Sequence, residues 1–369
     1  MTSKPHILIT GGAGYVGSRL ARRLVAEGKT SVTVIDNLRR GSVDSLSTVR
    51  DSIRFAEADV RDGDALHELT KGVDVVFHFA AESAVMAADA DPEYCFETNV
   101  TGTFRVLRAA RINGVRRVVF SSSREVYGDA VTIPVPETAP LQPKNAYGSS
   151  KAAAEMCCRP FVADGLDVSI ARLSNVYGPG DRGRVIPRFV EDALLGLPLT
   201  LFGAEQLIDF VWIETVLDAM MRLGFGPSIS WPINVGSGKG GTILELCERV
   251  VRATASPSPV EIVASRGVEV VRFVADTSAA QKWLGLSAPP DPLFGLDEVV
   301  NAARMGSEAG QSMETAGLKS STQPTRVRSS ISLGRISRRP PKWCCRHNAD
   351  KFSFRAAYRS NSPFICIYE

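Results

Sequence analysis

The chain lacks the long apolar segment that a membrane protein needs. A transmembrane helix takes about 20 consecutive apolar residues, and no stretch of the 369 residues approaches that length. The first residues, MTSKPHILIT, contain only a short apolar run before glycines begin, which is too short for the core of a signal peptide. We expect neither a membrane partner nor a secretory leader.

Cysteine is scarce and shows no paired spacing. The seven cysteines fall at positions 95, 157, 158, 247, 344, 345 and 366, without a CxxC motif. An odd number with this spacing favours reduced thiols in a cytoplasmic protein over a disulfide framework or a zinc site. We expect no bound metal.

Most of the chain also lacks an excess of positive charge. The chain has 43 Lys and Arg residues and 40 Asp and Glu residues. Residues 306–369 contain 11 of the basic and 4 of the acidic residues, so the rest of the chain has 32 basic against 36 acidic residues. This mildly acidic main part offers no electrostatic case for nucleic acid. The basic tail, residues 305–369, mixes charge with aromatic residues, as arms for nucleic acid or membrane surfaces do. Because it has no clear period, we expect instead a disordered extension, or a translated frame that was never selected to fold, without a catalytic role.

What the sequence does have is an alternation of strand-like and helix-like segments. Helix-like stretches, such as Val16 to Glu27, separate short apolar runs. The runs span residues 6–9, 32–35, 53–55, 73–79, 115–120 and 168–173. Strand and helix in alternation predict an α/β fold with a doubly wound parallel sheet, the Rossmann arrangement. Beyond residue 175, prolines and glycines interrupt shorter elements, which predicts a smaller C-terminal lobe.

A glycine-rich turn follows the first apolar run. The stretch ILITGGAGYVGSRL places Gly11, Gly14 and Gly17 between this run and the first helix. Glycines let backbone N–H groups approach a pyrophosphate, whose charge is favoured at a helix N-terminus. Asp36 ends the second apolar run, where a carboxylate accepts hydrogen bonds from a ribose diol and repels a 2′-phosphate. The pattern predicts NAD, although the arginines at 39 and 40 leave room for NADP.

The segment YGSSK is the strongest candidate for reacting groups. Tyr147 and Lys151 stand four residues apart, so they share one face of a helix. Free tyrosine, with a pKa of about 10, is a poor base at neutral pH. A nearby ammonium and the positive nicotinamide ring of an oxidised cofactor would favour the phenolate. Tyr147 is then able to take a proton from a sugar hydroxyl. By itself, YxxxK is also typical of ordinary helix surfaces.

Several further segments accompany these motifs in a fixed order. They are EADVRD at 57–62, HFAAES at 78–83, ETNVTGT at 97–103, SSSREVYG at 121–128, RLSNVYGPG at 172–180 and VIPRF at 185–189. To about residue 300, the chain resembles the extended short-chain dehydrogenase/reductase family. Within it, the resemblance is to the NAD-dependent nucleotide-sugar epimerases and dehydratases, of the UDP-glucose 4-epimerase type. The tail lies outside this resemblance.

The resemblance implies roles for individual residues. The expected catalytic residues are Ser123, Tyr147 and Lys151, with Glu125 as an added acid or base. The expected NAD contacts are Gly11, Gly14, Tyr15, Val16, Gly17, Asp36, Asn37, Asp59, Val60, Phe79, Ala80, Ala81, Asn99, Ser121, Tyr147 and Lys151. The expected contacts to a nucleotide-diphosphate sugar are Ser123, Asn175, Arg184, Arg266 and Glu269. His78 is expected to support the end of the sheet and not to titrate.

The second lobe departs from the family's pattern at one anchor. Family members commonly have an arginine before the aspartate of an RDF or RDY segment, where this chain has Ile208. An arginine there usually holds phosphate. We hypothesise that Arg184, at a position where sugar epimerases often have Asn, replaces the lost charge. The alternative is that Arg184 is a solvated loop residue.

Two residues leave the reaction type open. The favoured prediction is an NAD-dependent nucleotide-sugar 4-epimerase, for which a base, a hydroxyl and a lysine are enough. Glu125 favours a 4,6-dehydratase or a UDP-glucuronate decarboxylase, which usually have an Asp–Glu or Ser–Glu pair before VYG. Arg124 occupies the position of that partner and stays protonated, so it cannot act as an acid. A 4-ketoreductase and a non-catalytic NAD-binding sensor are further alternatives, and retention of the YxxxK motif argues against the sensor.

The same resemblance predicts the organisation of the chain. We expect an NAD-binding domain over residues 1–174, with a returning segment at about 206–236. The substrate-binding lobe is expected over residues 175–205 and 237–304. A homodimer is expected to form through helices around 98–111 and 147–161.

Overall fold

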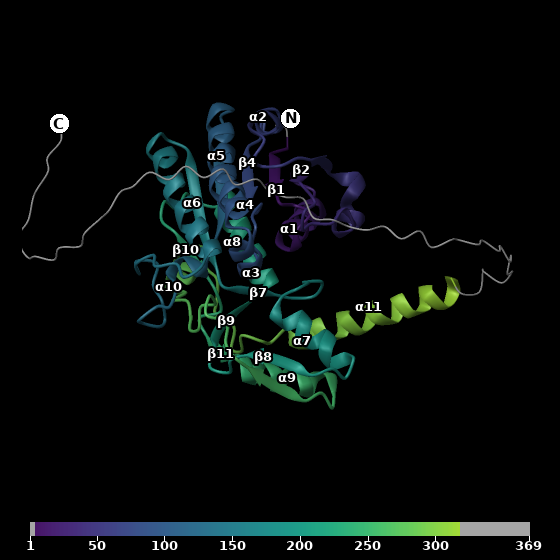
Figure 1. Ribbon diagram of the computed structural model, residues 1–369. Helices are drawn as coiled ribbons and strands as arrows, with labels where there is room; N and C mark the ends of the chain where they lie inside the picture. Colours follow the sequence, from purple (N-terminus) through teal and green to yellow (C-terminus); the bar gives the residue numbers. More distant parts are fainter. Residues whose placement is uncertain (1–3, 318–369) are drawn as a thin grey trace, which may run out of the picture. The chain divides into compact units, whose positions relative to one another are not determined.

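A parallel sheet organises the chain in the computed structural model, which describes the backbone of residues 4–317 and the side chains up to residue 306. Its seven strands lie in the order β10-β6-β5-β4-β1-β2-β3, and every neighbouring pair is parallel. The strands are β1 (His6–Thr10), β2 (Ser31–Asp36), β3 (Arg54–Glu57), β4 (Val75–His78), β5 (Arg117–Ser123), β6 (Asp167–Leu173) and β10 (Ile233–Val235). Figure 1 shows the sheet between helices.

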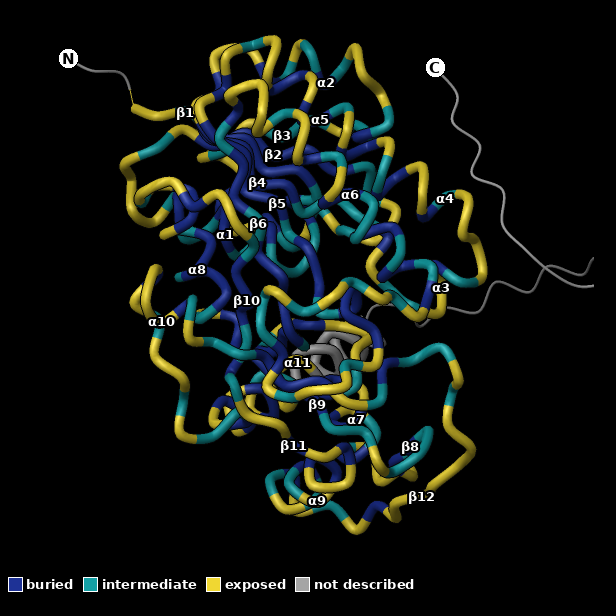
Figure 2. The backbone as a smooth tube through the Cα atoms, turned by 90° about the vertical axis from the view of Figure 1, so that its left-hand side faces the viewer, coloured by how far each residue is buried: buried dark blue, intermediate teal, exposed yellow. Residues whose placement is uncertain are grey.

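Alternating side chains of these strands build two separate cores. Successive strand residues point to opposite faces of a sheet, so Ile7 and Ile9 enter one cluster and Leu8 enters the other. The same alternation separates Phe77 from Val76 on β4. The strands are consequently the most continuously buried part of the trace in Figure 2.

Helices cover both faces of the sheet. The helices α1 (Tyr15–Glu27) and α8 (Ile213–Phe225) pack on the face that carries Ile7. The helices α2 (Gly63–Leu69), α5 (Gly102–Ile112) and α6 (Ala146–Ala163) pack on the face that carries Leu8. The prediction of a doubly wound α/β fold is confirmed.

Short helical segments complete this part of the chain. They are η1 (Val43–Ser52), α3 (Val85–Ala90), α4 (Pro92–Phe96), η2 (Glu97–Thr101) and η3 (Arg124–Tyr127). The wide π-type turn of η2 joins α4 to α5 without a break. Turns of this kind are frequent near functional sites, and this one carries the buried side chains of Thr98 and Asn99.

The second lobe is made from shorter elements. One small sheet has the order β11-β9-β7, and β12 pairs with β8 in another. These strands are β7 (Asn175–Tyr177), β8 (Leu199–Phe202), β9 (Leu207–Trp212), β11 (Gly240–Thr242) and β12 (Val260–Val263). The helices that accompany them are α7 (Val185–Leu194), α9 (Ile243–Thr254) and α10 (Ser278–Leu284). Between β9 and β11 the chain returns to the large sheet through α8 and β10.

The last described element is α11 (Leu296–Gly317). It continues past residue 305, where the sequence pattern placed the start of an irregular tail. The stretch from Ser307 to Gly317 is rich in Ala, Glu, Gln and Met, which are good helix formers. The rest of the expected tail, residues 318–369, lies outside the described residues.

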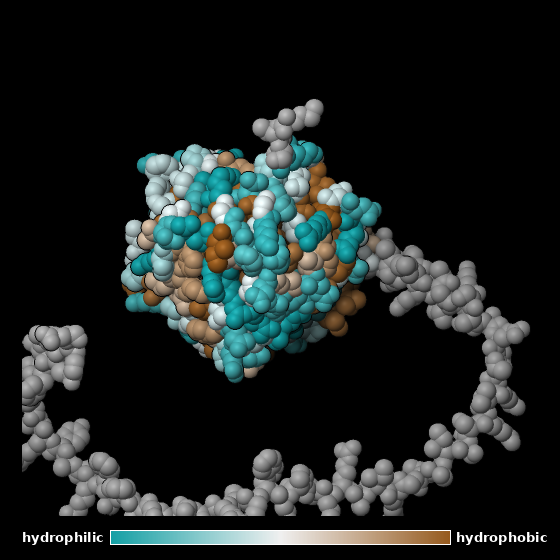
Figure 3. Space-filling view, turned by 90° about the horizontal axis from the view of Figure 1, so that it is seen from above, coloured by the Kyte–Doolittle hydropathy of each residue, from teal (hydrophilic) through white to brown (hydrophobic). Residues whose placement is uncertain are grey.

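The described residues give the molecule a largely polar face and free thiols. Seen from above, the molecule is largely hydrophilic, and hydrophobic side chains form small separate patches (Figure 3). Within residues 4–317, no helix is long and apolar enough to cross a membrane. In the same range, no group of His, Cys, Asp and Glu is arranged to hold a metal. The described cysteines, Cys95, Cys157, Cys158 and Cys247, are all unpaired.

Candidate active site

A cavity of about 940 Å³ lies at the carboxyl ends of β1, β2, β4 and β5 and extends to the second lobe. Open α/β sheets bind ligands at this edge, because the loops after the strands leave a crevice there. All of the site residues expected from the sequence line the cavity except Asp59 and Asn99. The fold therefore brings the two groups of predicted residues, cofactor and substrate, to one space.

The glycine-rich turn after β1 makes a cradle that only glycine permits. Gly11 has φ +65°, and a Cβ there would lie 2.6 Å from the backbone nitrogen of Ala80. A Cβ at Gly17 would lie 2.5 Å from the carbonyl oxygen of Gly11. Gly14 is the N-cap of α1, and no side chain caps this helix. Its first residues line the cavity, where free N–H groups of a helix N-terminus favour an anion. These residues fit a dinucleotide pyrophosphate.

Asp36 is held in place at the end of β2. Its side-chain oxygens accept hydrogen bonds from the backbone N–H of Ala13 at 3.0 Å and of Leu38 at 2.9 Å. Burial raises the pKa of Asp36, and the backbone hydrogen bonds oppose this rise. The carboxylate is thereby fixed beside the turn, as a group that binds ribose hydroxyls must be.

Asp59 and Asn99 lie behind the cavity wall and act through neighbours. Asp59 accepts a hydrogen bond from the amide of Asn37 at 2.8 Å. Burial would raise the pKa of Asp59, but hydrogen bonds from Arg61 and Asn37 outweigh it and lower the pKa to about 2. Asn99 is buried and accepts from the backbone N–H of Glu82 at 2.8 Å. Asn37 and Glu82, unlike the two residues that hold them, line the cavity.

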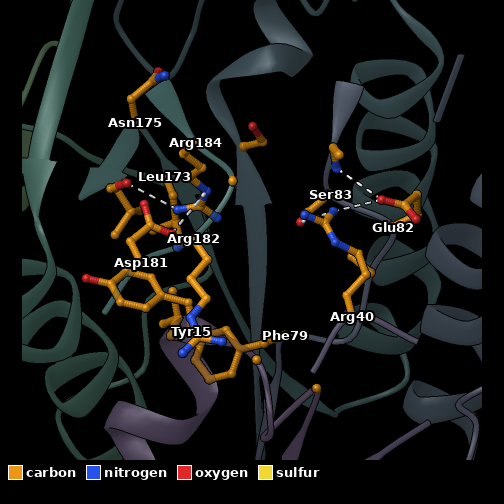
Figure 4. A pocket seen from close by; sticks show the side chains of 18 of the residues that line it. Tyr15, Arg40, Phe79, Glu82, Ser83, Leu173, Asn175, Asp181, Arg182 and Arg184 are labelled. Atoms are coloured by element: carbon orange, nitrogen blue, oxygen red, sulfur yellow. Dashed lines mark hydrogen bonds and ion pairs between the residues drawn. The ribbon is translucent and has the colours of Figure 1, made fainter. Parts of the chain in front are cut away.

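The two arginines after Asp36 are engaged by other groups. Arg39 stacks on the ring of Tyr94 at 3.6 Å. Arg40 donates to Glu82 at 2.8 Å and to Ser83 at 3.2 Å, on one side of the cavity in Figure 4. Both guanidinium groups thus already have partners within the protein, which agrees with NAD as the cofactor.

Three consecutive serines at the end of β5 meet one face of α6. Lys151 donates from Nζ to the carbonyl oxygen of Ser121 at 2.8 Å. Ser122 donates to Glu155 at 2.5 Å, and the hydroxyl of Ser123 interacts with Tyr147. Because Tyr147, Lys151 and Glu155 are spaced by four residues, they project from one side of the helix. The arrangement brings the predicted hydroxyl, base and lysine together at the cavity floor.

Burial opposes the ionised form of both Tyr147 and Lys151. It raises the pKa of Tyr147 to about 12, with the hydrogen bond from Ser123 acting in the opposite direction. It lowers the pKa of Lys151 to about 8. The surrounding protein thus keeps Tyr147 neutral, and the positive charge that an oxidised nicotinamide supplies when bound is needed to favour the phenolate.

Glu125 is buried with both carboxylate oxygens occupied. Arg124 contacts Oε1 through Nη2 at 2.9 Å. The amide of Asn145 donates to Oε2 at 2.8 Å. Asn145 is also the residue that caps α6, since its oxygen accepts from the backbone N–H of Gly148. This double role of Asn145 was missed from the sequence, although Asn before a helical stretch is a capping signal.

The cavity contains buried polar atoms that have no partner among the described residues. The structure shows eight such side-chain atoms, and five belong to residues that line the cavity. They are the atoms of Tyr15, Thr98, Ser174, Asp181 and Gln206. Burial raises the pKa of Asp181 to about 6. Unpaired buried polar groups are costly, so their concentration here points to a polar ligand.

The second lobe supplies arginines but not at position 208. Ile208 is buried against the cavity. Arg184 donates to the carbonyl oxygen of Val176 at 3.1 Å and lies on the same side of the cavity as Asp181 in Figure 4. Arg266 stacks on the ring of Phe202 at 3.5 Å and lies 3.3 Å from Glu269.

His78 is not among the residues that line the cavity, and it connects neighbouring elements through hydrogen bonds. Its ring nitrogens contact the hydroxyls of Thr10 at 2.6 Å and Thr103 at 3.0 Å. Burial lowers its pKa to about 3, so the ring is neutral at physiological pH. Glu82 and Asp181, by contrast, enter the cavity without having been selected from the sequence, because single acidic residues in loops carry no periodic signal.

Comparison with known proteins identifies the family. The model of the NAD dependent epimerase/dehydratase family matches residues 7–224. The chain belongs to this family. Its membership confirms the predicted family, the enzyme class and NAD as the cofactor.

Both epimerases and dehydratases are among the proteins that this chain resembles. A UDP-glucose 4-epimerase of Mycolicibacterium smegmatis is 34% identical over 290 residues, which cover 75% of this chain and 92% of that protein. The Thermus thermophilus UDP-glucose 4-epimerase, solved with NAD, has TM-score 0.75 and 31% identity, with coverage of 81% and 99%. The dTDP-glucose 4,6-dehydratase DesIV of Streptomyces venezuelae, also solved with NAD, has TM-score 0.78 and 32% identity, with coverage of 82% and 98%. Overall similarity therefore does not separate the two reactions.

We predict that Gly11→Ala weakens NAD binding at least about tenfold, because the new methyl group meets the backbone of Ala80 inside the cradle. Gly28→Ala is the matched control, since Gly28 has φ +66° but nothing within 4 Å of an added Cβ. It is expected to cost about 1–2 kcal/mol of stability and to leave NAD affinity unchanged. Calorimetric titration with NAD and urea unfolding measure the two effects. Equal NAD affinity in the two variants would contradict the assignment of the cradle.

Proposed function

We propose that this protein is an NAD-dependent nucleotide-sugar 4-epimerase. The observation that carries the proposal is the meeting of Ser123, Tyr147 and Lys151 on the floor of a cavity that the glycine cradle and the second lobe share. Such a site needs one base, one hydroxyl and room for a sugar to turn. A cavity of about 940 Å³ offers that room beside a nucleotide.

Each residue of the trio has a distinct task. NAD, when bound, supplies the hydride acceptor and donor for sugar C4. Tyr147 takes the proton of the C4 hydroxyl and later returns it. Ser123 hydrogen-bonds the same oxygen and orients it. Lys151, held by the carbonyl of Ser121, places a positive charge that favours ionised Tyr147.

The state of Glu125 favours epimerisation over a lyase reaction. Elimination or decarboxylation needs a further group that gives or takes a proton at the sugar. Glu125 is the buried acid next to the trio, but Arg124 and Asn145 bind both of its oxygens. A 4,6-dehydratase is the second candidate, supported by the similarity to DesIV.

Charge at the cavity supports a substrate with a diphosphate. Ten Arg and Lys residues line it, against six Asp and Glu. A nucleotide-diphosphate sugar together with NAD would bring several negative charges, which this excess balances. We propose that the lobe of residues 175–205 and 237–304 binds the nucleotide, and that residues 1–174 with the segment at about 206–236 bind NAD.

The reaction is tested by offering UDP-, dTDP- and GDP-hexoses to the purified protein and resolving the products by NMR. We expect the 4-epimer of one of them and no net consumption of NAD. Tyr147→Phe should lower turnover about 100- to 10,000-fold, and Glu125→Gln should leave it nearly intact. A 4-keto-6-deoxy sugar or a pentose as the wild-type product would replace the epimerase with a dehydratase or a decarboxylase. Bound NAD without any turnover would favour a sensor.

We propose that Arg184 supplies the diphosphate contact absent at Ile208. Arg184 lines the cavity and carries a half-exposed side chain. Arg184→Ala and Arg266→Ala should each weaken substrate binding about tenfold, the effect of one lost charged hydrogen bond. Titration of the NAD-loaded protein with the substrate measures both. If only Arg266→Ala weakens binding, Arg184 is a solvated loop residue.

We propose that the outer faces of α5 and α6 join two copies of the chain. Phe104 on α5 is 44% exposed and Met156 on α6 is 41% exposed, and the ring of Phe104 packs edge-on against Phe161 at 5.6 Å. Exposed large apolar groups on adjacent helices are typical of an interface.

This dimer predicts the effect of charge on its surface. Phe104→Glu with Met156→Glu should shift the protein from dimer to monomer in light scattering, because two carboxylates per copy would be buried. Leu195→Glu, at a residue 72% exposed beyond α7, is the control and should leave the mass unchanged. A wild-type protein that is already monomeric would refute the proposal.

A further inference from the structure

Arg124 connects the end of β5 to the second lobe. Its Nη2 lies 2.9 Å from Oε1 of Glu125, and its Nε donates to the side-chain oxygen of Asn175 at 2.5 Å. Asn175 is the first residue of β7, so the guanidinium spans two sheets. The arginine side chain is only 11% exposed, and its guanidinium lies over the ring of Phe273 at 5.8 Å. Packing and hydrogen bonds together fix its position.

Donors of the protein bind both oxygens of Glu125. The oxygen of Asn145 must accept from the N–H of Gly148, so its NH2 group is the part that faces Oε2 of Glu125. Arg124 has only donors and faces Oε1. Donors of the protein therefore hold both oxygens of Glu125 and fix the orientation of its side chain.

The 4-keto sugar formed during epimerisation can lose water if a free carboxylate lies near C5. A ketone at C4 makes the C5 hydrogen acidic, and the hydroxyl at C6 stands β to that ketone. A free carboxylate beside the ring removes the C5 proton, and the electron pair left behind is held as the enolate of the C4 ketone. As this pair forms the C5–C6 double bond, the C6–O bond breaks, and the hydroxyl leaves as water with the proton that the carboxyl group has just taken up. An epimerase that forms the ketone must keep such a base away from C5.

We propose that Arg124 is a specificity-determining residue that ties Glu125 up and so confines the enzyme to epimerisation. The inference rests on the proposed function, since it concerns what happens to the ketone formed in that reaction. Arg124 acts through Glu125 and is a positioning residue, not a group that reacts. Removal of Arg124 frees Oε1 of Glu125 from its contact with the guanidinium, so that this carboxylate oxygen can turn toward the sugar and act as a base there.

The second contact of Arg124 sets the orientation of Asn175. Because Nε of Arg124 donates to the amide oxygen, the NH2 group of Asn175 is turned away from the arginine. Asn175 lines the cavity, so this NH2 group is available to an acceptor on the substrate. Loss of the two contacts that the guanidinium of Arg124 makes, to Glu125 and to Asn175, is expected to affect substrate binding as well as the choice of product.

The test measures the ratio of dehydrated to epimerised product from UDP-glucose and dTDP-glucose, by mass spectrometry and NMR. Arg124→Met is expected to raise this ratio at least about tenfold over the wild type, within the range that a freed acid or base gives. The double variant Arg124→Met with Glu125→Gln should return it to the wild-type value. Arg124→Lys keeps the positive charge next to Glu125 but loses the second contact, to Asn175. It should therefore raise KM and leave the product ratio unchanged. If Arg124→Met fails to fold, Arg124→Gln takes its place in the same comparison.

The outcomes separate this inference from the proposed function. An increase in dehydrated product that depends on Glu125 supports the role of Arg124. A wild-type protein that epimerises, with variants that only slow down and form no dehydrated product, overturns the inference and leaves the epimerase intact. A wild-type protein that itself dehydrates the sugar overturns both.

Discussion

The contact between the end of β5 and one face of α6 determines the geometry of the site. Next to the catalytic pair, Glu155 accepts a hydrogen bond from the hydroxyl of Ser122 at 2.5 Å and forms an ion pair with Arg172 of β6 at 2.7 Å. The side chains of Glu155 and Arg172 are almost fully buried. A buried ion pair of this kind gains little over apolar packing but is costly to break. It therefore fixes the rotation of α6 more than it adds stability. Lys151 and Tyr147, one and two turns earlier on α6, are oriented by that rotation.

The parts of the site that could be predicted from the sequence are those set by local backbone geometry. The glycine turn and the YxxxK spacing are local patterns, and backbone sterics or helix periodicity convert them directly into geometry. Asp59 and Asn99 were expected to reach the cavity, yet the structure places them behind Asn37 and Glu82. Which side chain of a neighbouring pair faces the ligand depends on packing between distant segments. That information has no period and no fixed spacing.

The wall of the cavity contains groups that lower the stability of the fold and favour a bound polar ligand. Five buried polar atoms in its wall lack a partner among the described residues, and each such group costs about 1–3 kcal/mol. A wall built only to support the fold would have apolar groups at these positions. Tyr15 comes from α1 and Asp181 from the loop after β7, so both lobes contribute. The unpaired groups are therefore a property of the cleft, and a bound ligand that satisfies them would also hold the lobes together.

The choice of reaction depends on a different kind of interaction from the one that builds the site. Members of this family with either activity resemble the chain to a similar extent, so the shared trio cannot distinguish them. The feature of this chain that bears on the choice is the set of contacts made by Glu125, the acid next to the trio. In this chain a carboxylate is present, but its charge is balanced within the protein by an arginine one residue earlier. The presence of a carboxylate in the wall of an active site is thus weaker support for acid or base chemistry when, as here, donors of the protein hold both of its oxygens.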